Sequence, residues 1–363
     1  MKPFIPHELP LKKLNWEKFQ RILGPANRAV ARYDGLLQSI PNPAVLLSPL
    51  TTQEAVLSSK IEGTQATLEE VLKFQANPQK EVKHYNDIRE IINYRKAMAY
   101  AVEELDKKPL NLNLIKSMHS ILLDSVRGQN KSRGKFRTIQ NWIGKPGTPI
   151  EEARFVPPAP LKLPDCLDAY EKYIHTEDAD SLVQAAILHA QFEILHPFID
   201  GNGRIGRILI PLYLYSKNIL HQPMFYISAY LEEHREEYYD HLKGISENND
   251  WEAWISFFLT AVDTQARSNT EKAQMILSLY NSMKQRIVDS THSQYALQAL
   301  DSLFNLGIFT TTDFRKNSGI PKPSNARIIS TLRDEKIIDT LEEASGRKPA
   351  IYIFRSLIDI INQ

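Results

Sequence analysis

Cysteine, glycine and long apolar runs are all scarce in this chain of 363 residues. The single cysteine, Cys166, cannot form an internal disulfide or a cysteine-based zinc cage, which favours a reducing compartment. The longest purely apolar run, Ile208–Tyr215, falls far short of the roughly 20 residues that a membrane-spanning helix needs. Prolines and charges occupy the N-terminus, where a signal peptide needs an apolar core. These absences predict a cytoplasmic protein.

A surplus of either charge is also absent, because 44 Lys and Arg residues are balanced by 43 Asp and Glu residues, which leaves a net charge of +1. This balance excludes a general nucleic-acid coat protein, whose whole surface is basic. Hydrophobic residues make up 42% of the chain and charged residues 24%, an ordinary globular mixture that excludes wholesale disorder. At roughly 100–200 residues per domain, the length predicts two or three domains.

Helix-forming residues are plentiful and only 14 residues are glycine, so we expect a mostly α fold. Asn15 can cap a first helix, which Gly24-Pro25 is expected to interrupt. The stretch 136–157 is the exception, because its alternating, β-rich pattern around Pro146-Gly147 predicts a β-hairpin. Further helices are predicted at 26–37, 51–62, 81–106, 111–125, 164–174, 179–195, 203–217, 228–246 and 251–285.

The C-terminal stretch 290–363 has a different pattern. A helix is expected at 294–306, short helices begin at Thr312 and Ser324, and two short strands flank a turn at Ser345-Gly346. Helix, helix, turn, helix and hairpin is the order of a winged helix, so we predict a C-terminal winged-helix-like domain. The predicted domains are an N-terminal helical region at 1–110, a central core at 111–288 and the winged-helix-like domain at 290–363.

The segment most informative about chemistry is HPFIDGNGRIGR at 196–207. One helix ends at its proline, a Gly-Asn-Gly loop follows, and a second helix then begins. Free N–H groups and the positive dipole at such a helix start suit phosphates, and Arg204 and Arg207 add charged donors beside them. Asp200 can hold Mg²⁺, and His196 can take a proton from a hydroxyl near neutral pH. Together these groups describe phosphoryl or nucleotidyl transfer.

Other interpretations of this segment were weighed. Its G-x-G-x-x-G spacing matches the dinucleotide fingerprint, but a helix precedes it and no acidic residue follows until Glu232, so we reject that fold. His189, His196 and Asp200 are candidates for a metal triad, although the i, i+7 spacing of the histidines disfavours zinc and favours a packed His189. A simple turn would explain the Gly-Asn-Gly loop alone, but not the histidine and arginines around it.

The same twelve residues match the signature HPF-x-(D/E)-GNGR-x-x-R of the Fic (filamentation-induced-by-cAMP) proteins at every specified position. The resemblance extends over about residues 15–290. It implies a helical Fic core with a β-hairpin flap at 136–157. Because Fic proteins mostly move AMP from ATP onto a hydroxyl of a target protein, it also implies a protein adenylyltransferase with ATP as substrate and Mg²⁺ as cofactor.

The resemblance assigns roles to individual residues. His196 resembles the base that deprotonates a Ser, Thr or Tyr hydroxyl, and Asp200 resembles the Mg²⁺ ligand. Tyr238 and Tyr239 resemble a region that reaches the adenine, and packing between helices is the alternative for this pair. The residues implied to bind ATP are Gly201, Asn202, Gly203, Arg204, Ile205, Gly206, Arg207, Asn141, Trp142, Ile143, Gly144, Tyr238 and Tyr239. The free edge of the flap would hold the target protein as an added β-strand, which makes side-chain selectivity weak.

A second family feature lies upstream, in the predicted helix at about 51–63. Ser58, Glu62 and Gly63 match the inhibitory pattern (S/T)-x-x-x-E-(G/N), and the resemblance implies that Glu62 pairs with Arg207 in place of the γ-phosphate. The alternative is a surface glutamate with a glycine cap. An exposed ion pair contributes only about 0–1 kcal/mol, whereas holding an enzyme mostly off needs about 5.5 kcal/mol. Autoinhibition therefore predicts that Glu62 is largely buried or that its helix is held by packing, for example across a homodimer.

Two further hypotheses stay open. In the first, the same pocket works in reverse, and Glu62 orients a water that removes AMP from a modified target. In the second, the winged-helix-like domain binds DNA through a recognition helix that begins near Ser324. Acidic residues dilute its basic charge, which slightly favours a protein-interaction or packing module instead. The basic residues concerned are Arg315, Lys316, Lys322, Arg327 and Arg333.

Overall fold

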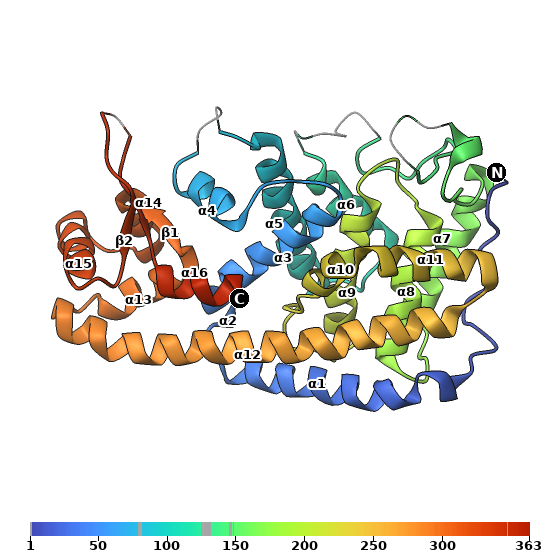
Figure 1. Ribbon diagram of the computed structural model, residues 1–363, viewed down its shortest axis with the longest axis horizontal. Coiled ribbons are helices and arrows are strands. Elements are labelled where there is room, and N and C mark those ends of the chain that lie inside the picture. The colour runs from blue at the N-terminus through green and yellow to red at the C-terminus, as the bar shows by residue number, and fades with distance from the viewer. Residues whose placement is uncertain are drawn as a thin grey trace.

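The computed structural model describes residues 2–78, 82–124, 126, 132–144, 147, 149–346 and 348–363, and these confirm a mostly helical fold (Figure 1). The helices are α1 (Gln20–Ser39), α2 (Pro43–Leu46), α3 (Ser48–Ile61), α4 (Leu68–Ala76), α5 (Tyr85–Leu105), α6 (Leu112–Leu122), α7 (Leu163–His175), α8 (Ser181–Leu195), α9 (Asn202–Ser216), α10 (Ser228–Glu233), α11 (Arg235–Asn248), α12 (Trp251–Thr291), α13 (Ala296–Leu306), α14 (Thr311–Ser318), α15 (Lys322–Asp334) and α16 (Arg355–Asn362). Short 3-10 helices lie at Trp16–Lys18, Ile150–Glu152 and Pro160–Lys162, and the strands are β1 (Ile308–Thr310), β2 (Asp339–Glu342) and β3 (Ile351–Ile353).

Two helices organise the core. Every residue of α8 from Leu182 to Leu195 is buried, and most of them are apolar, as expected of a helix enclosed by the core. The 41-residue α12 runs along the molecule with α1 beside it, and joins the core to the C-terminal elements (Figure 1). Its first half contacts α8 and α11, and its second half contacts α13, α15 and α16. Among the residues described, no helix has both the length and the apolar character that crossing a bilayer requires.

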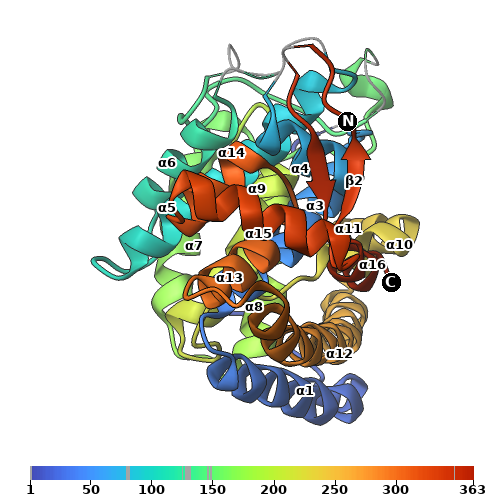
Figure 2. The ribbon, with the colours of Figure 1, turned by 90° about the vertical axis from the view of Figure 1, so that its left-hand side faces the viewer.

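In the region predicted as a winged-helix-like domain, the elements are α13, β1, α14, α15, β2, β3 and α16 in that order, so the structure adds β1 and α16 to the predicted set. The three strands form an antiparallel sheet in the order β1-β3-β2, and Tyr352 on β3 pairs with Phe309 on one side and Thr340 on the other. Figure 2 shows this domain from its own end, with α14 and α15 beside the strands. The domain packs onto the N-terminal region, where α13 contacts α2 and α3, β1 contacts α4, and α16 contacts α3.

Two local expectations differ from the structure. Gly24-Pro25 does not interrupt the first helix, because α1 continues through it and buries Ala26, Val30 and Tyr33 against the core, and this packing outweighs the lost N–H bond of Pro25. In the described residues, the predicted hairpin at 136–157 consists of one isolated antiparallel bridge between Ile143 and Phe155, and the 3-10 helix Ile150–Glu152 lies between these two residues in the chain. Residues 145, 146 and 148, where its turn was predicted, lie outside the described residues.

Candidate active site

The candidate site is the connection between α8 and α9. His196 ends α8 in the left-handed conformation, with φ of 44°, and its N–H donates to the Phe192 carbonyl at 3.0 Å. Gly201 precedes α9 with φ of 79°, a value that glycine adopts without strain. A histidine with positive φ is uncommon and tends to occur at functional sites. The two left-handed residues fold the segment back so that His196 comes within electrostatic range of Asp200 and Glu62.

Asn202 holds the loop closed. Its side-chain oxygen accepts the N–H of Phe198 at 2.8 Å, and its amide nitrogen donates to the Phe198 carbonyl at 2.9 Å. The Asn141 amide, which comes from the flap segment, donates to the same carbonyl at 2.9 Å and to the His196 carbonyl at 3.3 Å. Both asparagines therefore act on the loop backbone, and the anion-binding capacity of the loop lies in the N–H groups at the start of α9.

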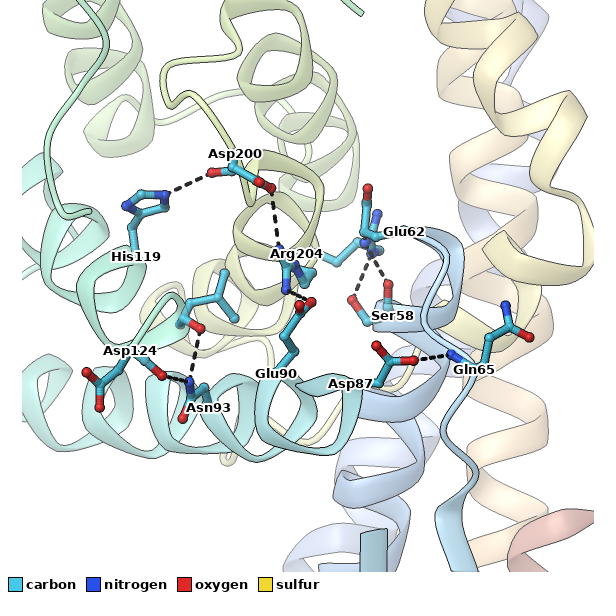
Figure 3. A network of polar contacts seen from close by, with 12 residues as sticks. Ser58, Glu62, Gln65, Asp87, Glu90, Asn93, His119, Asp124, Asp200 and Arg204 are labelled. Carbon is cyan, nitrogen blue, oxygen red and sulfur yellow. Dashed lines mark hydrogen bonds and ion pairs between the residues drawn. The ribbon is translucent and has the colours of Figure 1, made fainter. Parts of the chain in front are cut away.

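His119, on α6, supports the loop from the other side and was not predicted. Its Nδ1 accepts the N–H of Gly134 at 2.9 Å, so its Nε2 carries the hydrogen and donates to the Asp200 carbonyl at 2.9 Å. The ring stacks on Phe198 with centroids 3.7 Å apart. Burial is the main cause that lowers the pKa of His119 to about 4, so it stays neutral and fixes the backbone at Asp200 (Figure 3).

The imidazole of His196 is set up to accept a proton. Its Nδ1 lies 3.3 Å from the carbonyl oxygen of Glu193, and because a carbonyl only accepts, the hydrogen sits on Nδ1. Nε2 is left with its lone pair. Burial lowers the pKa of His196 to about 4, so the ring is neutral at physiological pH. A neutral, oriented imidazole can act as a general base.

The two arginines of the motif are both buried and both paired with a carboxylate. Arg204 is 2% exposed and donates to Glu90 of α5 at 2.6 Å, where the glutamate side chain is 1% exposed. Its other nitrogen lies 3.6 Å from the Asp200 carboxylate. Figure 3 shows Glu90 and Asp200 on opposite sides of this guanidinium. Arg204 therefore joins α5 to the loop and has less freedom to hold a phosphate than the sequence predicted.

Arg207 is bound by the end of α3. Its guanidinium is 1% exposed and donates to the Ser58 hydroxyl at 2.8 Å, the Ser58 carbonyl at 2.8 Å and the Glu62 carboxylate at 2.7 Å. Burial raises the pKa of Glu62, but the charge and hydrogen bond of Arg207 outweigh burial and lower it, so Glu62 is ionised. The pair implied by the family pattern is thus present, and Gly63 follows it with φ of 95°.

The Glu62 carboxylate stands directly over the start of α9. A Cβ atom built on Gly203 would lie 2.1 Å from Glu62 Oε1 and 3.0 Å from an Arg207 nitrogen. The side chain of Glu62 is one-third exposed, so one face of this carboxylate reaches solvent. Glu62 therefore occupies the place above the free N–H groups where an anion would bind, and Gly203 is the residue that makes room for it.

Glu193, on α8, is a second buried carboxyl that the sequence analysis missed. It is 9% exposed, and its Oε1 has no hydrogen-bond partner in the described residues. A Cβ on Gly206 would lie 2.3 Å from this oxygen, which explains a glycine in the interior of α9. Burial raises the pKa of Glu193 to about 8, so it is mostly protonated at neutral pH. The signal available in the sequence was a lone acid in an otherwise apolar helix next to the motif.

Several residues implied to bind ATP have other contacts in the structure. Ile205 is fully buried, and its N–H is bonded to the Gly201 carbonyl, so it faces the core. The Gly206 carbonyl contacts His189 Nδ1 at 3.1 Å. Tyr238 is 1% exposed, and its hydroxyl lies 2.9 Å from His189 Nε2, a contact that favours the alternative of packing between helices.

The remaining implied contacts lie nearer the surface. Tyr239 is half-buried, and its ring lies against the guanidinium groups of Arg154 and Arg235. In the flap, Ile143 is half-buried, while Trp142 and Gly144 are exposed. Ile139 also exposes 63% of its surface there, so the flap presents apolar side chains to solvent.

The donor set for a metal ion is small. In the part of the chain that the structure describes, no three His, Cys, Asp or Glu side chains are grouped to hold a metal. Mg²⁺ does not require such a group, because it commonly takes one carboxylate together with substrate phosphates. The Asp200 side chain is 25% exposed beside the start of α9. Asp200 therefore fits a magnesium ion that enters with a nucleotide.

A helical core that places a neutral histidine, a carboxylate and an open helix start on one loop has the architecture of a Fic fold. Family models confirm this: the Fic/DOC family N-terminal model matches residues 20–103 and the Fic/DOC family model matches residues 109–214. Together they cover more than half of the chain, and the chain belongs to the Fic/DOC family.

Known proteins show the same relationship. A probable protein adenylyltransferase of Aquifex aeolicus (strain VF5) is 26% identical over 177 residues, which is 48% of this chain and 51% of that protein. The protein adenylyltransferase Fic of Drosophila grimshawi is 31% identical over 135 residues, 35% of this chain and 25% of that protein. The matched region thus spans about half or less of these relatives.

Solved structures share the fold. A Fic family protein from Desulfovibrio desulfuricans G20 has a TM-score of 0.60 at 19% identity and covers 96% of this chain and 98% of its own. A Fic-domain signaling protein from Bacteroides thetaiotaomicron has a TM-score of 0.56 at 17% identity, covering 70% of this chain and 97% of its own. The first of these includes the C-terminal elements in its coverage.

Proposed function

We propose that this protein is an adenylyltransferase that moves AMP from ATP onto a Ser, Thr or Tyr hydroxyl of a target protein and of itself. The observation that carries the proposal is His196, a neutral imidazole with its Nε2 lone pair free, held beside the open start of α9. The names of the relatives, protein adenylyltransferases, support the same reaction class.

The residues of this chain divide the reaction between them. His196 Nε2 takes the proton of the incoming hydroxyl, whose oxygen then bonds to the α-phosphorus of ATP. The bond from that phosphorus to the bridging oxygen breaks, pyrophosphate leaves with the bonding electron pair, and AMP remains as an ester on the target. The N–H groups at the start of α9 bind phosphate oxygens, and the guanidinium of Arg207 neutralises the negative charge of the phosphates beyond the α-phosphate.

Asp200 would hold Mg²⁺ together with the nucleotide. The cation would neutralise charge on the phosphate oxygens when bound. Asp200 itself is positioned by the His119 bond to its carbonyl and by Arg204 beside its carboxylate. These two contacts keep the ligand side chain at the edge of the loop.

Glu62 would inhibit this reaction by competing for Arg207. Its carboxylate takes the space above Gly203. The same guanidinium also donates hydrogen bonds to the hydroxyl and the carbonyl of Ser58. An exposed pair alone would contribute only about 0–1 kcal/mol. Here α3 is buried along most of its length, and Lys60 adds an ion pair with Glu232 at 3.0 Å, so packing of the helix supplements the pair.

The deciding experiment is intact-mass measurement of the Glu62→Gly protein after exposure to ATP and Mg²⁺. We expect the added mass of one or more adenylyl groups, little addition on the wild type, and none on a protein that carries both Glu62→Gly and His196→Ala. An unchanged mass of the Glu62→Gly protein would overturn the proposal. Equal labelling of the double variant would remove His196 as the base.

The reverse reaction is a second candidate, because Glu62 is ionised and partly exposed beside His196. Such a carboxylate can orient a water for removal of AMP from a modified target. Incubation of wild-type protein with a pre-modified partner, under varied Mg²⁺ or Ca²⁺, tests it. Release of AMP that Glu62→Gly abolishes would support this direction, and absence of release would count against it.

Partner interactions follow as proposals. The exposed side chains of Ile139 and Trp142 support the docking of a target segment as an added strand at the flap. On α15, Lys322, Arg327 and Arg333 are exposed, which keeps DNA binding as a hypothesis to be tested by salt-dependent binding of the full chain to duplex DNA. A homodimer and a cytoplasmic location remain predictions, for which sedimentation and fractionation are the measurements.

A further inference from the structure

A polar hollow of about 470 Å³ lies far from the catalytic loop, between the start of α3 and the C-terminal domain. The ends of α4 and α13, the strand β1 and the helices α5 and α14 surround it, so it lies at the junction of the two parts of the molecule (Figure 1). Ser48 begins α3 at this hollow, whereas Glu62 follows the other end of the helix. A 14-residue helix with a rise of about 1.5 Å per residue separates the two places by about 20 Å.

Arg95, from α5, lines the hollow and forms no ion pair with a carboxylate of the described residues. Its guanidinium is half-buried, and the one hydrogen bond it makes within the described residues goes to the neutral Ser48 hydroxyl at 3.3 Å. On α9, the buried Arg204 and Arg207 each have a glutamate within 2.7 Å, whereas in the described residues the buried Arg137 donates to backbone carbonyls. Burying a cation without a counter-ion costs free energy. An anion that enters the hollow would therefore bind more tightly than it would at an arginine on the open surface.

The rest of the lining is also suited to an anion. Lys316 on α14 adds a second cation, which forms no ion pair in the described part of the chain. Gln75 and Asn305 add amide donors, and the positive end of α3 lies at Ser48. The single acid of the lining, Asp313, has its Oδ2 engaged by the hydroxyl of Thr310 at 2.6 Å as the cap of α14.

We propose that this hollow binds a small phosphate-bearing anion, with Arg95 and Lys316 as its charged donors. A guanidinium and an ammonium on different walls, supplemented by amides and a helix start, match the several oxygens of a phosphate or diphosphate group. The volume exceeds that of one phosphate and has room for a diphosphate. A bound anion would bridge α5, α3 and the C-terminal domain.

The test is calorimetric titration of the full chain with pyrophosphate, inorganic phosphate and acetate, repeated for three variants. Arg95→Gln and Lys316→Gln each remove one charge, and we expect each to weaken pyrophosphate binding by at least about fivefold. Arg315→Gln is the matched control, because Arg315 is an equally exposed neighbour on α14 that does not line the hollow. Pyrophosphate is expected to bind more tightly than phosphate, and acetate not measurably.

Hydrogen exchange locates the site and separates it from the catalytic loop. Protection on adding pyrophosphate at residues 47–52 and 308–317 supports the proposal. Protection confined to 200–207, binding unaffected by Lys316→Gln and Arg95→Gln, or no binding at millimolar pyrophosphate would overturn it. Because this readout needs neither ATP nor a target protein, it fails or succeeds independently of adenylyl transfer.

Discussion

The two glutamate–arginine pairs of the candidate site have similar distances but different surroundings. Glu90 comes from the second turn of α5, and both it and Arg204 are almost completely buried. Glu62 follows the last residue of α3, and a third of its side chain reaches solvent, while its partner Arg207 is as buried as Arg204. One carboxylate is therefore enclosed by the core, and the other can leave its arginine by moving toward solvent.

The comparison of Glu90 with Glu62 indicates that burial of the glutamate, and not the distance of the ion pair, decides whether the carboxylate stays on its arginine. Removing one member of a buried pair leaves an unpaired charge that water cannot reach. Removing a half-exposed partner lets water replace it. The structure thus assigns a scaffolding role to the first pair and a releasable one to the second.

The largest expected effect comes from breaking the enclosed pair. Glu90→Ala should lower the free energy of unfolding by about 3–5 kcal/mol, because it strands the charge of Arg204. Glu62→Ala should lower it by about 1 kcal/mol or less. Urea denaturation of both variants measures the two losses. If they are equal, the two pairs are equivalent and the comparison is wrong.

A third carboxyl near Arg207 sharpens the comparison through pH. Burial raises the pKa of Glu193 to about 8 in the folded protein. Its favourable contribution to the free energy of unfolding is therefore complete below the pKa that it has in the unfolded chain, and this contribution is lost as pH rises through 8. Glu193→Gln cannot ionise, so its stability relative to wild type should rise by about 2–3 kcal/mol between pH 5.5 and 8. Thermal denaturation at the two pH values measures this, with exposed Glu103→Gln as the control. A pH-independent difference would show that Glu193 is ionised throughout.

A double-mutant cycle tests the position of Glu62 over α9. Gly203→Ala in the wild type places a Cβ against Glu62 Oε1 and should cost about 1 kcal/mol. In the Glu62→Ala protein the obstruction is gone, and the same change should be neutral or stabilising by about 0.5 kcal/mol, because alanine favours a helix. The coupling energy of about 1–2 kcal/mol is measured by denaturant unfolding. Additive effects would mean that Glu62 does not occupy this place in solution.

The smallest expected effect comes from the surface pair that holds the end of α3. Lys60 lies 3.0 Å from Glu232 on α10, with half of the lysine side chain exposed. Lys60→Ala should change stability by about 0–1 kcal/mol, and the change should diminish in high salt. Denaturation at low and high ionic strength checks this. A loss of stability that high salt does not reduce would indicate that the methylene groups of Lys60 stabilise the protein by packing, and that its charge does not.

Much of the fold and part of the site could be predicted from the sequence. The apolar periodicity located most helices, and the proline and glycines around His196 marked the turn between α8 and α9. The resemblance to Fic proteins implied the contact between Glu62 and Arg207, two residues 145 positions apart that no local pattern could join. Its inhibitory meaning remains a proposal.

The missed residues are polar side chains in helix interiors. Glu90, His119 and Glu193 belong to no motif, and the residues they contact lie on other helices or on loops far along the chain. Helical spacing shows which face is apolar, but it does not show which single acid or histidine on a helix meets a loop far along the chain. The two interpretations of Tyr238 could not be separated for the same reason, since its partner His189 comes from α8.

If Glu62 inhibits the protein as proposed, the burial of α3 limits how the protein can be activated. Ala55, Ser58, Ser59 and Ile61 are completely enclosed, and α10, α13 and α16 all contact this helix. Withdrawing it would dismantle the core, at a cost comparable to the whole stability of a domain. Activation is therefore expected to consist of turning one glutamate side chain outward about its own bonds. Such a rotation is rapid in an exposed residue, so the resting protein would sample the active arrangement continually, and a regulator would need only to trap it.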